Sequence, residues 1–335
     1  MAICVTTNEV CMGGGCFKQV PTGVEFTGKA FSFGFVDCRT PTMRGETCGF
    51  GSGGARPFPF TQASTCFEKW PFASDSNSTG VGDVPTGHAD SGGASSYICG
   101  YNMGGDNGGN LCTITKFAFA SNSNGSCMGD LSQARRSVGG VGSREAAYAH
   151  GGYNPERSTI DKFLFASEGP ASAFPTGLTV ARLQTGGSAS GDFGYGVGGL
   201  AGGSRKDVID RYPFATDTQA LDVGELTQGR HALSLQSSLT HGYATGGTNP
   251  GATAVNTITK FPFATASTGD SDVGELSQIG ATGYGVSSFT HGYKAGGYNG
   301  GVKGDIEKFA FASDGNASDI GQLIATYREN TAGTQ

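Results

Sequence analysis

The feature that most constrains this chain is a motif that returns six times at a nearly constant spacing. Its consensus is Ile-x-Lys-Phe-x-Phe-Ala-Ser/Thr, and its second aromatic residue recurs every 46 to 49 residues. Within each copy, the two aromatic residues alternate with other side chains, which is the period of a half-buried β-strand. A period of this length indicates repeated supersecondary units. The copies begin at Phe67 (a diverged copy), Ile114, Ile160, Ile209, Ile258 and Ile306.

Three further elements accompany each copy. An aromatic-x-x-Gly-Gly segment precedes it, and Asp-Val/Ile-Gly-Glu/Gln-Leu follows it, for example at Asp222, Asp272 and Asp319. A fourth segment, which we expect to be a strand, comes next, as at residues 230–235. Four short strands in about 48 residues are typical of the blades of a β-propeller. The aromatic-x-x-Gly-Gly copies begin at Phe50, Tyr101, Tyr148, Tyr243 and Tyr293, with a degraded copy at Gly199-x-x-Gly202-Gly203.

We therefore predict an all-β chain that forms one seven-bladed β-propeller domain over residues 1–335, with four-stranded antiparallel blades. Six blades follow the six full units, and the seventh combines residues 1–36 with the C-terminal segment 324–330. In that blade, Val10-x-x-Gly13-Gly14 supplies the second strand and Lys29–Phe33 the aromatic strand. Pairing the two chain ends would remove exposed sheet edges. Six blades with an irregular N-terminal extension are the alternative. The six full units span 37–84, 85–131, 132–178, 179–226, 227–276 and 277–323.

The composition limits the partners that we expect. The chain has 59 glycines without an every-third-residue pattern, so glycine separates short strands rather than building a collagen helix. Charged residues make up 15% with a net charge of −6, and no basic stripe for nucleic acid is present. No apolar run approaches the roughly 18 residues of a membrane span. The start, Met1–Glu9, does not read as a secretory signal, so we expect synthesis in a cytoplasm and no membrane insertion.

The nine cysteines all lie within the first 127 residues. Their number is odd, and no pair of Cys-x-x-Cys motifs marks a zinc site. Buried thiols are the first interpretation, because free cysteine behaves as a small buried hydrophobe. Disulfides and metal ligation remain alternatives.

The candidate catalytic residues all have structural explanations. His241 and His291 stand two residues before an aromatic, in a slot that holds Cys48, Cys99, Ala146 and Val197 in other units, which indicates a packing position. The basic residue of the aromatic strand is expected to pair between blades with the acid of Asp-Val-Gly-Glu-Leu, or to be a solvated charge. Nucleophile elbows, phosphate-binding loops and zinc-protease helices are absent from the sequence. We therefore predict no enzyme, with no catalytic residue, cofactor or metal site. The basic residues are Lys69, Lys116, Lys162, Arg211, Lys260 and Lys308.

Recognition is expected where the units differ most, in the polar segment between the Gly-Gly strand and the aromatic strand. Variable loops on a rigid repetitive scaffold commonly carry binding. Residues 1–70, the most divergent and cysteine-rich region, are the predicted docking site for a partner subunit. The candidate recognition residues are Tyr153, Asn154, Glu156, Arg157, Asn249, Tyr298 and Asn299.

Two resemblances follow from these motifs. The Tyr-x-x-Gly-Gly strand resembles the kelch repeat, but Asp-Val/Ile-Gly-Glu/Gln-Leu stands where kelch repeats carry a tryptophan, and Trp70 is the only tryptophan. The combination of Lys-Phe-Pro-Phe-Ala-Thr at 260–265 with His-Gly-Tyr-x-x-Gly-Gly resembles Gly-rich propeller repeats in virion structural proteins of marine bacteriophages, including those of cyanobacteria.

The second resemblance implies a non-enzymatic virion protein, located in the tail or fibre or decorating the capsid, for assembly or host-surface attachment. Its partners would be other virion proteins and a host-surface glycan or protein. The alternative is a bacterial kelch-like carbohydrate-binding protein or enzyme. An intracellular scaffold would be favoured by a fused adaptor domain, and the sequence shows none.

Overall fold

The chain consists of β-strands that fall into two compact units, Met1–Thr40 and Pro41–Gln335. The computed structural model describes residues 47–54, 63–264 and 269–324 with their side chains, and the backbone of strands at 3–5, 9–12, 15–20, 23–28 and 332–334. The predicted all-β class is confirmed, since these residues contain no α-helix. Within them, no helix has the length and apolar character needed to cross a membrane.

The second unit is a β-propeller of six four-stranded antiparallel blades, and each blade runs outward from an inner strand. Blade 1 has β30 (Ala332–Thr334), β5 (Cys48–Ser52), β6 (Cys66–Pro71) and β7 (Thr79–Asp83). Blade 2 has β8 (Gly92–Ser95), β9 (Cys99–Asp106), β10 (Asn110–Ala118) and β11 (Ser126–Asp130). Blade 3 has β12 (Gly139–Gly142), β13 (Ala146–His150), β14 (Ile160–Leu164) and β15 (Ser172–Ala173).

The other three blades repeat this order. Blade 4 has β16 (Gly186–Ala189), β17 (Phe193–Val197), β20 (Val208–Pro213) and β21 (Leu221–Glu225), with a small hairpin of β18 (Leu200–Ala201) and β19 (Ser204–Arg205) between β17 and β20. Blade 5 has β22 (Ser234–Ser237), β23 (His241–Thr245), β24 (Thr257–Pro262) and β25 (Ser271–Glu275). Blade 6 has β26 (Tyr284–Ser287), β27 (His291–Tyr298), β28 (Val302–Ala310) and β29 (Ser318–Gln322).

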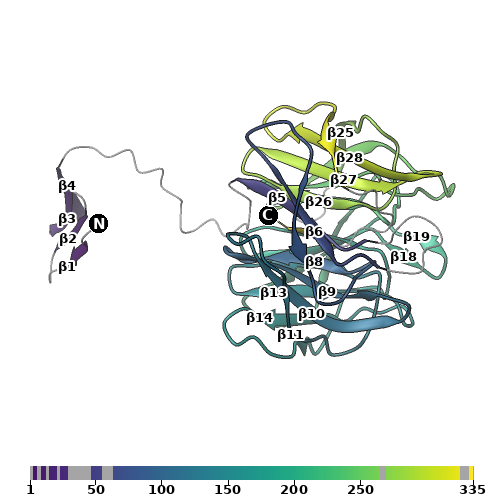
Figure 1. Cartoon of the computed structure of the whole chain (residues 1–335), viewed down its shortest axis with the longest axis horizontal. Helices are drawn as coiled ribbons and strands as arrows, with labels where there is room; N and C mark the ends of the chain where they lie inside the picture. The colour runs from purple at the N-terminus through teal and green to yellow at the C-terminus, as the bar shows by residue number, and fades with distance from the viewer. Residues whose placement is uncertain are drawn as a thin grey trace. The chain divides into compact units, whose positions relative to one another are not determined.

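Stacked aromatic rings connect every blade to the next and so complete the circle. The aromatic of each second strand packs on the second aromatic of the following blade, with ring centroids 4.7 to 4.9 Å apart; five of the pairs are stacked, and Phe50–Phe119 is tilted. Figure 1 shows the yellow strand β26 beside the purple strand β5, so the last blade is a neighbour of the first. The six pairs are Phe50–Phe119, Tyr101–Phe165, Tyr148–Phe214, Tyr195–Phe263, Tyr243–Phe311 and Tyr293–Phe72.

The predicted seventh blade, shared by the two chain ends, is wrong. Strand β5 begins blade 1 at its second position, and β30 supplies the missing inner strand, with Thr334 opposite Phe50 and Ala332 opposite Ser52. The described N-terminal strands pair only with one another. The ring closes at six because the C-terminal strand alone completes blade 1. The predicted strands at Lys29–Phe33 and 325–328 lie outside the described residues.

The N-terminal unit contains one antiparallel sheet in the order β1 (Ile3–Val5), β2 (Glu9–Met12), β3 (Gly15–Val20) and β4 (Gly23–Gly28). Its register places Cys4 opposite Cys11 and Cys11 opposite Cys16. In the described part of the second unit, no disulfide joins Cys48, Cys99, Cys112 or Cys127. The side chains of Cys4, Cys11, Cys16 and Cys38 lie outside the described residues.

Blade 4 corrects one motif assignment. Its aromatic-x-x-Gly-Gly copy begins at Tyr195 and ends in Gly198-Gly199, because Tyr195 pairs with Arg211 as Tyr148 pairs with Lys162. Both glycines have a positive φ, 60° and 109°, that favours glycine. The segment contains two Gly-Gly pairs, and the second one, at 202–203, lies in the β18–β19 hairpin. The histidine slot is therefore filled in this blade by Phe193 rather than Val197.

The repeated lysines do bridge blades, but the predicted acid is wrong. Each partner of a lysine stands three residues after the second aromatic of the next blade. The Asp of Asp-Val-Gly-Glu-Leu does not pair with a lysine; its carboxylate accepts a hydrogen bond from the backbone N–H two residues later, as Asp222 does from Gly224. Lys69 donates to Asn122, and Arg211 stacks on Phe193, 4.6 Å from the ring centroid. These half-exposed pairs contribute about 0–1 kcal/mol each. The ion pairs are Lys116–Glu168, Lys162–Asp217, Lys260–Asp314 and Lys308–Asp75.

A buried acidic side chain on the third strand of a blade accepts hydrogen bonds from the segment that leads into that blade. Asp161 of blade 3 accepts hydrogen bonds from the N–H of Ser132 at 3.1 Å and from Arg135 at 2.8 Å. Glu68 of blade 1 accepts one from the N–H of Ile324, which follows the last strand of blade 6, at 2.8 Å. The same arrangement therefore operates within the ring and at its closure.

His150 makes the ring sensitive to acid. Its imidazole is fully buried, with Nδ1 3.1 Å from the hydroxyl of Tyr212, and burial lowers its pKa from 6.5 to about 3. Below pH 6.5 the unfolded chain takes up a proton that the folded protein excludes, so stability is lost as the pH falls. At 1.36 kcal/mol per pH unit, about 3 kcal/mol is lost between pH 6.5 and pH 4.

We therefore expect His150→Gln to lose less stability than the wild type when urea unfolding is compared at pH 7 and pH 4. His241→Gln, which changes a half-buried histidine whose pKa is also lowered, is the matched control and should reduce the pH dependence less than His150→Gln does. Equal pH dependence in all three proteins would contradict the assignment.

Candidate functional site at the channel mouth

The six inner strands surround a central channel, and they approach one another closely. Neighbouring inner strands contact each other around the whole ring. A Cβ added at Gly140 would lie 2.3 Å from the carbonyl oxygen of Gly93, so only glycine allows this approach. The close packing fixes the position of the residues that lead into each inner strand.

The residue two positions before the inner strand has a left-handed backbone in five blades, with φ between 53° and 59°. In four of these blades, its N–H donates to the carbonyl of the equivalent residue in the preceding blade, at 2.7 to 3.1 Å. Non-glycine residues in this conformation are uncommon, and their recurrence at one position marks a feature that the fold maintains. These hydrogen bonds arrange five side chains around the channel mouth, and we call the five residues the mouth ring. They are Asp90, Ser137, Gln184, Ala232 and Thr282.

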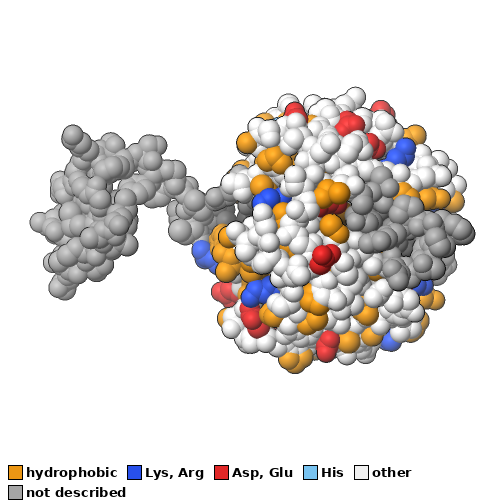
Figure 2. Space-filling view, in the orientation of Figure 1, with side chains coloured by type: hydrophobic (Ala, Val, Ile, Leu, Met, Phe, Trp, Pro, Cys, Tyr) orange, Lys and Arg blue, Asp and Glu red, His pale blue; other side chains and the backbone are white. Residues whose placement is uncertain are grey.

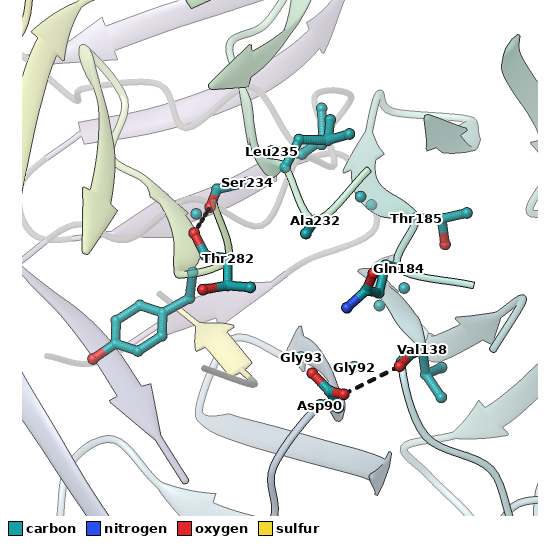
Figure 3. A pocket seen from close by; sticks show the side chains of 18 of the residues that line it. Asp90, Gly92, Gly93, Val138, Gln184, Thr185, Ala232, Ser234, Leu235 and Thr282 are labelled. Carbon is teal, nitrogen blue, oxygen red and sulfur yellow. Dashed lines mark hydrogen bonds between the residues drawn. The ribbon is translucent and has the colours of Figure 1, made fainter. Parts of the chain in front are cut away.

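The mouth ring opens into a cavity of about 130 Å³. Figure 3 shows Asp90, Gln184 and Thr282 around it, contributed by blades 2, 4 and 6. Within the described part of the chain, the buried hydroxyls of Ser91, Thr185 and Thr282 have no hydrogen-bond partner. Ser91 and Thr185 stand where blades 3 and 5 have the core residues Val138 and Leu233, and their side chains pack against the Gly-Gly segment of the second strand. The volume corresponds to about four water molecules or one polar group of a ligand.

A second cavity of about 290 Å³ adjoins the first and shares three residues of the mouth ring. Its other lining residues are Arg136, Leu183 and Tyr153, and Tyr153 is 41% exposed. The guanidinium of Arg136 lies 5.5 Å from the ring centroid of Tyr153 and 3.1 Å from a carboxylate oxygen of Asp106. Two backbone hydrogen bonds between Arg136 and Tyr153 fix this pair. We call this the Tyr153 cavity.

Of the seven predicted recognition residues, Tyr153 lines this cavity. Of the others, Glu156 accepts from the N–H of Gly202 in the β18–β19 hairpin of blade 4, and Asn249 accepts from the N–H of Thr253 in its own loop. Arg157 donates to the carbonyl of Asn154, which precedes a cis Pro155. The N–H of Asn299 donates to Gly301, and Tyr298 pairs through its backbone with Ala281.

The histidines of the repeated slot lie beside their tyrosines. His241 and His291 each have Nδ1 2.8 Å from the hydroxyl of the preceding threonine and a ring about 6.5 Å from Tyr243 or Tyr293. Burial lowers the pKa of both. In the part of the chain that is described, no three His, Cys, Asp or Glu side chains form a group that could hold a metal ion.

Comparison of the chain with protein-family models finds no matching family, and comparison with curated proteins finds no matching relative. The function must therefore be inferred from the site. On the face drawn in Figure 2, the basic and acidic side chains of the described residues stand interspersed rather than in blocks of one sign.

Proposed function

We propose that this protein is a non-enzymatic binding propeller of a bacteriophage particle, a tail or fibre component or a capsid decoration that serves assembly or host-surface attachment. The observation that supports it is the mouth ring: one backbone conformation occurs five times, and each time it presents a different side chain. A scaffold that keeps its backbone and varies its side chains at one face suits recognition. The resemblance to Gly-rich virion propellers directs the proposal to a phage.

The size of the channel-mouth cavity also favours contact with part of a larger partner over enclosure of a small molecule. The channel-mouth cavity of about 130 Å³ is well below the roughly 300–1,000 Å³ of pockets that enclose a small organic molecule. A ligand at this face would touch the protein with part of its structure and extend into solvent. Recognition of a larger partner, such as a surface polymer or protein, fits this shape.

The proposal is tested with purified particles of a phage that encodes the protein. Mass spectrometry of gradient-purified particles should detect it in stoichiometric amount with known structural proteins, and antibody against residues 41–335 should label intact particles in electron micrographs. A protein abundant in the infected-cell lysate but absent from particles would contradict the proposal.

A further inference from the structure

The end of the propeller opposite the mouth ring carries five turns of one design. In blades 2 to 6, the inner strand runs from the mouth ring to a turn in which a serine is followed by a two-residue tip. The backbone N–H of the residue after each tip donates to the hydroxyl of this serine at 3.0 to 3.2 Å, so the five tips are held alike and differ in their side chains. We call the end formed by these tips the tip face. The tips are residues 97–98, 144–145, 191–192, 239–240 and 289–290.

The tips of blades 2, 5 and 6 each carry a large apolar side chain. Tyr97 and Ile98 of blade 2, Leu239 of blade 5 and Phe289 of blade 6 are between 51% and 71% exposed. Single exposed apolar side chains are ordinary on a protein surface. Their gathering at one structural position on one end of the molecule marks an interaction surface.

The tips of blades 3 and 4 are charged instead. Arg144 and Glu145 form the tip of blade 3, and Asp192 belongs to the tip of blade 4. These three residues are exposed, and none of their side chains has a hydrogen bond or an ion pair in the described part of the chain. Both tips border one cavity of about 260 Å³. The tip face therefore combines free charges on one side with apolar side chains on the rest.

We infer that the tip face binds the tip face of a second copy of this chain in a symmetric dimer. A twofold axis in the plane of the face pairs each blade with one blade of the partner subunit. The blades follow one another around the ring in the order 1 to 6. When the axis passes between blades 3 and 4 and between blades 6 and 1, blade 2 meets blade 5, blade 3 meets blade 4, and blade 6 meets blade 1.

The chemistry of the tips selects this arrangement. It places Tyr97 and Ile98 against Leu239 of the partner subunit, and Arg144 against Asp192 of the partner subunit. Every other axis of this kind sets a charged tip of blade 3 or 4 against an apolar tip, which costs the charge its hydration. Apolar contact supplies affinity, and the charge pairs fix the register. Because the face is complementary to itself, its occupant is a second copy.

Sedimentation velocity of the full-length protein at micromolar concentrations should show a concentration-dependent dimer. Leu239→Asp should weaken the dimer at least about tenfold, because it sets a charge against an apolar tip. Ile279→Asp is the matched control and should leave the dimer unchanged, since Ile279 is 44% exposed in the segment that leads to the mouth ring. Unchanged Trp70 emission in both variants will show that they are folded.

Charge reversal tests the pairing itself. Arg144→Asp and Asp192→Arg should each weaken self-association, because like charges then meet. Mixed in equal amounts, the two variants should form a heterodimer, since each acid of one then faces a base of the other. Glu145→Gln should tighten the dimer, because Glu145 opposes the approach of Asp192 of the partner subunit.

Three results would each overturn the inference. They are a monomer at all micromolar concentrations, an oligomer that Leu239→Asp leaves intact, and no association in the mixture of the two charge variants. The inference does not depend on the proposed function, so the particle experiment and the sedimentation experiment can fail separately.

Discussion

Replacing Asp210 with alanine is expected to lower the free energy of unfolding by about 3–5 kcal/mol. The side chains of Asp210 and Arg182 are both fully buried, and their oxygen and nitrogen lie 2.8 Å apart. Asp210 also accepts hydrogen bonds from the N–H and the hydroxyl of Thr179, in the segment that enters blade 4, at 3.0 and 2.6 Å. Its removal leaves a buried guanidinium charge and a backbone N–H without their acceptor.

Urea unfolding followed by circular dichroism measures the effect. Asp210→Asn, which keeps an acceptor but loses the charge, should be less destabilised than Asp210→Ala. The double variant Arg182→Met/Asp210→Leu should also be more stable than Asp210→Ala, because no unpaired charge remains. Asp161→Ala, at the same position in blade 3, should repeat the loss. A loss below about 1 kcal/mol for Asp210→Ala would show that the pair does not hold the blades.

The repeat hides this interaction from a motif search, because different residues build it in different blades. In blade 5, Thr259 stands at the position of Asp210, and the acid near Arg230 is Asp270, 3.8 Å away. In blade 6, Gly280 replaces the arginine, and Lys294 from β27 fills the space beside it. Burial lowers the pKa of Lys294 to about 8. Comparing equivalent sequence positions among the blades does not reveal this interaction, because the buried basic residue of blade 6 lies on a different strand.

The elements of the fold were predictable for a local reason. Alternation of Phe117 and Phe119 with other residues indicates a half-buried strand, and the sixfold return of this pattern indicates blades. Ile114 is three residues before Phe117 and so breaks the two-residue period, and the pairing with β11 shifts register directly after it. The closure was not predictable in this way. Strand β30 is three residues long and reads Ala-Gly-Thr, with no aromatic residue and a single β-branched one, and its pairing with β5 spans almost the whole second unit.

The candidate site was predictable only in part. Tyr153 was found because its loop differs from the others, but Asp90 and Gln184 were not, since they share only a backbone conformation with their equivalents. Their spacing, two residues before each inner strand, could have aligned them once the fourth run of each unit was placed. The sequence spacing also does not show that the two cavities share lining residues, because this depends on how neighbouring blades come together in three dimensions.

Loss of strand β30 is expected to have the largest effect of all. Deletion of residues 332–335 leaves blade 1 with three strands and exposes the edge of β5 at the channel. Trp70, the single tryptophan, reports on this seam, because it is fully buried and its ring lies 6.0 Å from Tyr284 of blade 6. We expect an earlier unfolding transition and exposure of Trp70 to solvent, seen as a red-shifted emission.

The central claim is that six blades close the ring without the N-terminal unit. The most direct test is urea unfolding of the chain lacking residues 1–40, followed through Trp70 fluorescence and compared with the full-length protein. A six-bladed ring predicts a midpoint and emission maximum like those of the full chain, with a difference in unfolding free energy within about 0.5 kcal/mol. A large loss of stability with exposure of Trp70, as the deletion of 332–335 should cause, would contradict it.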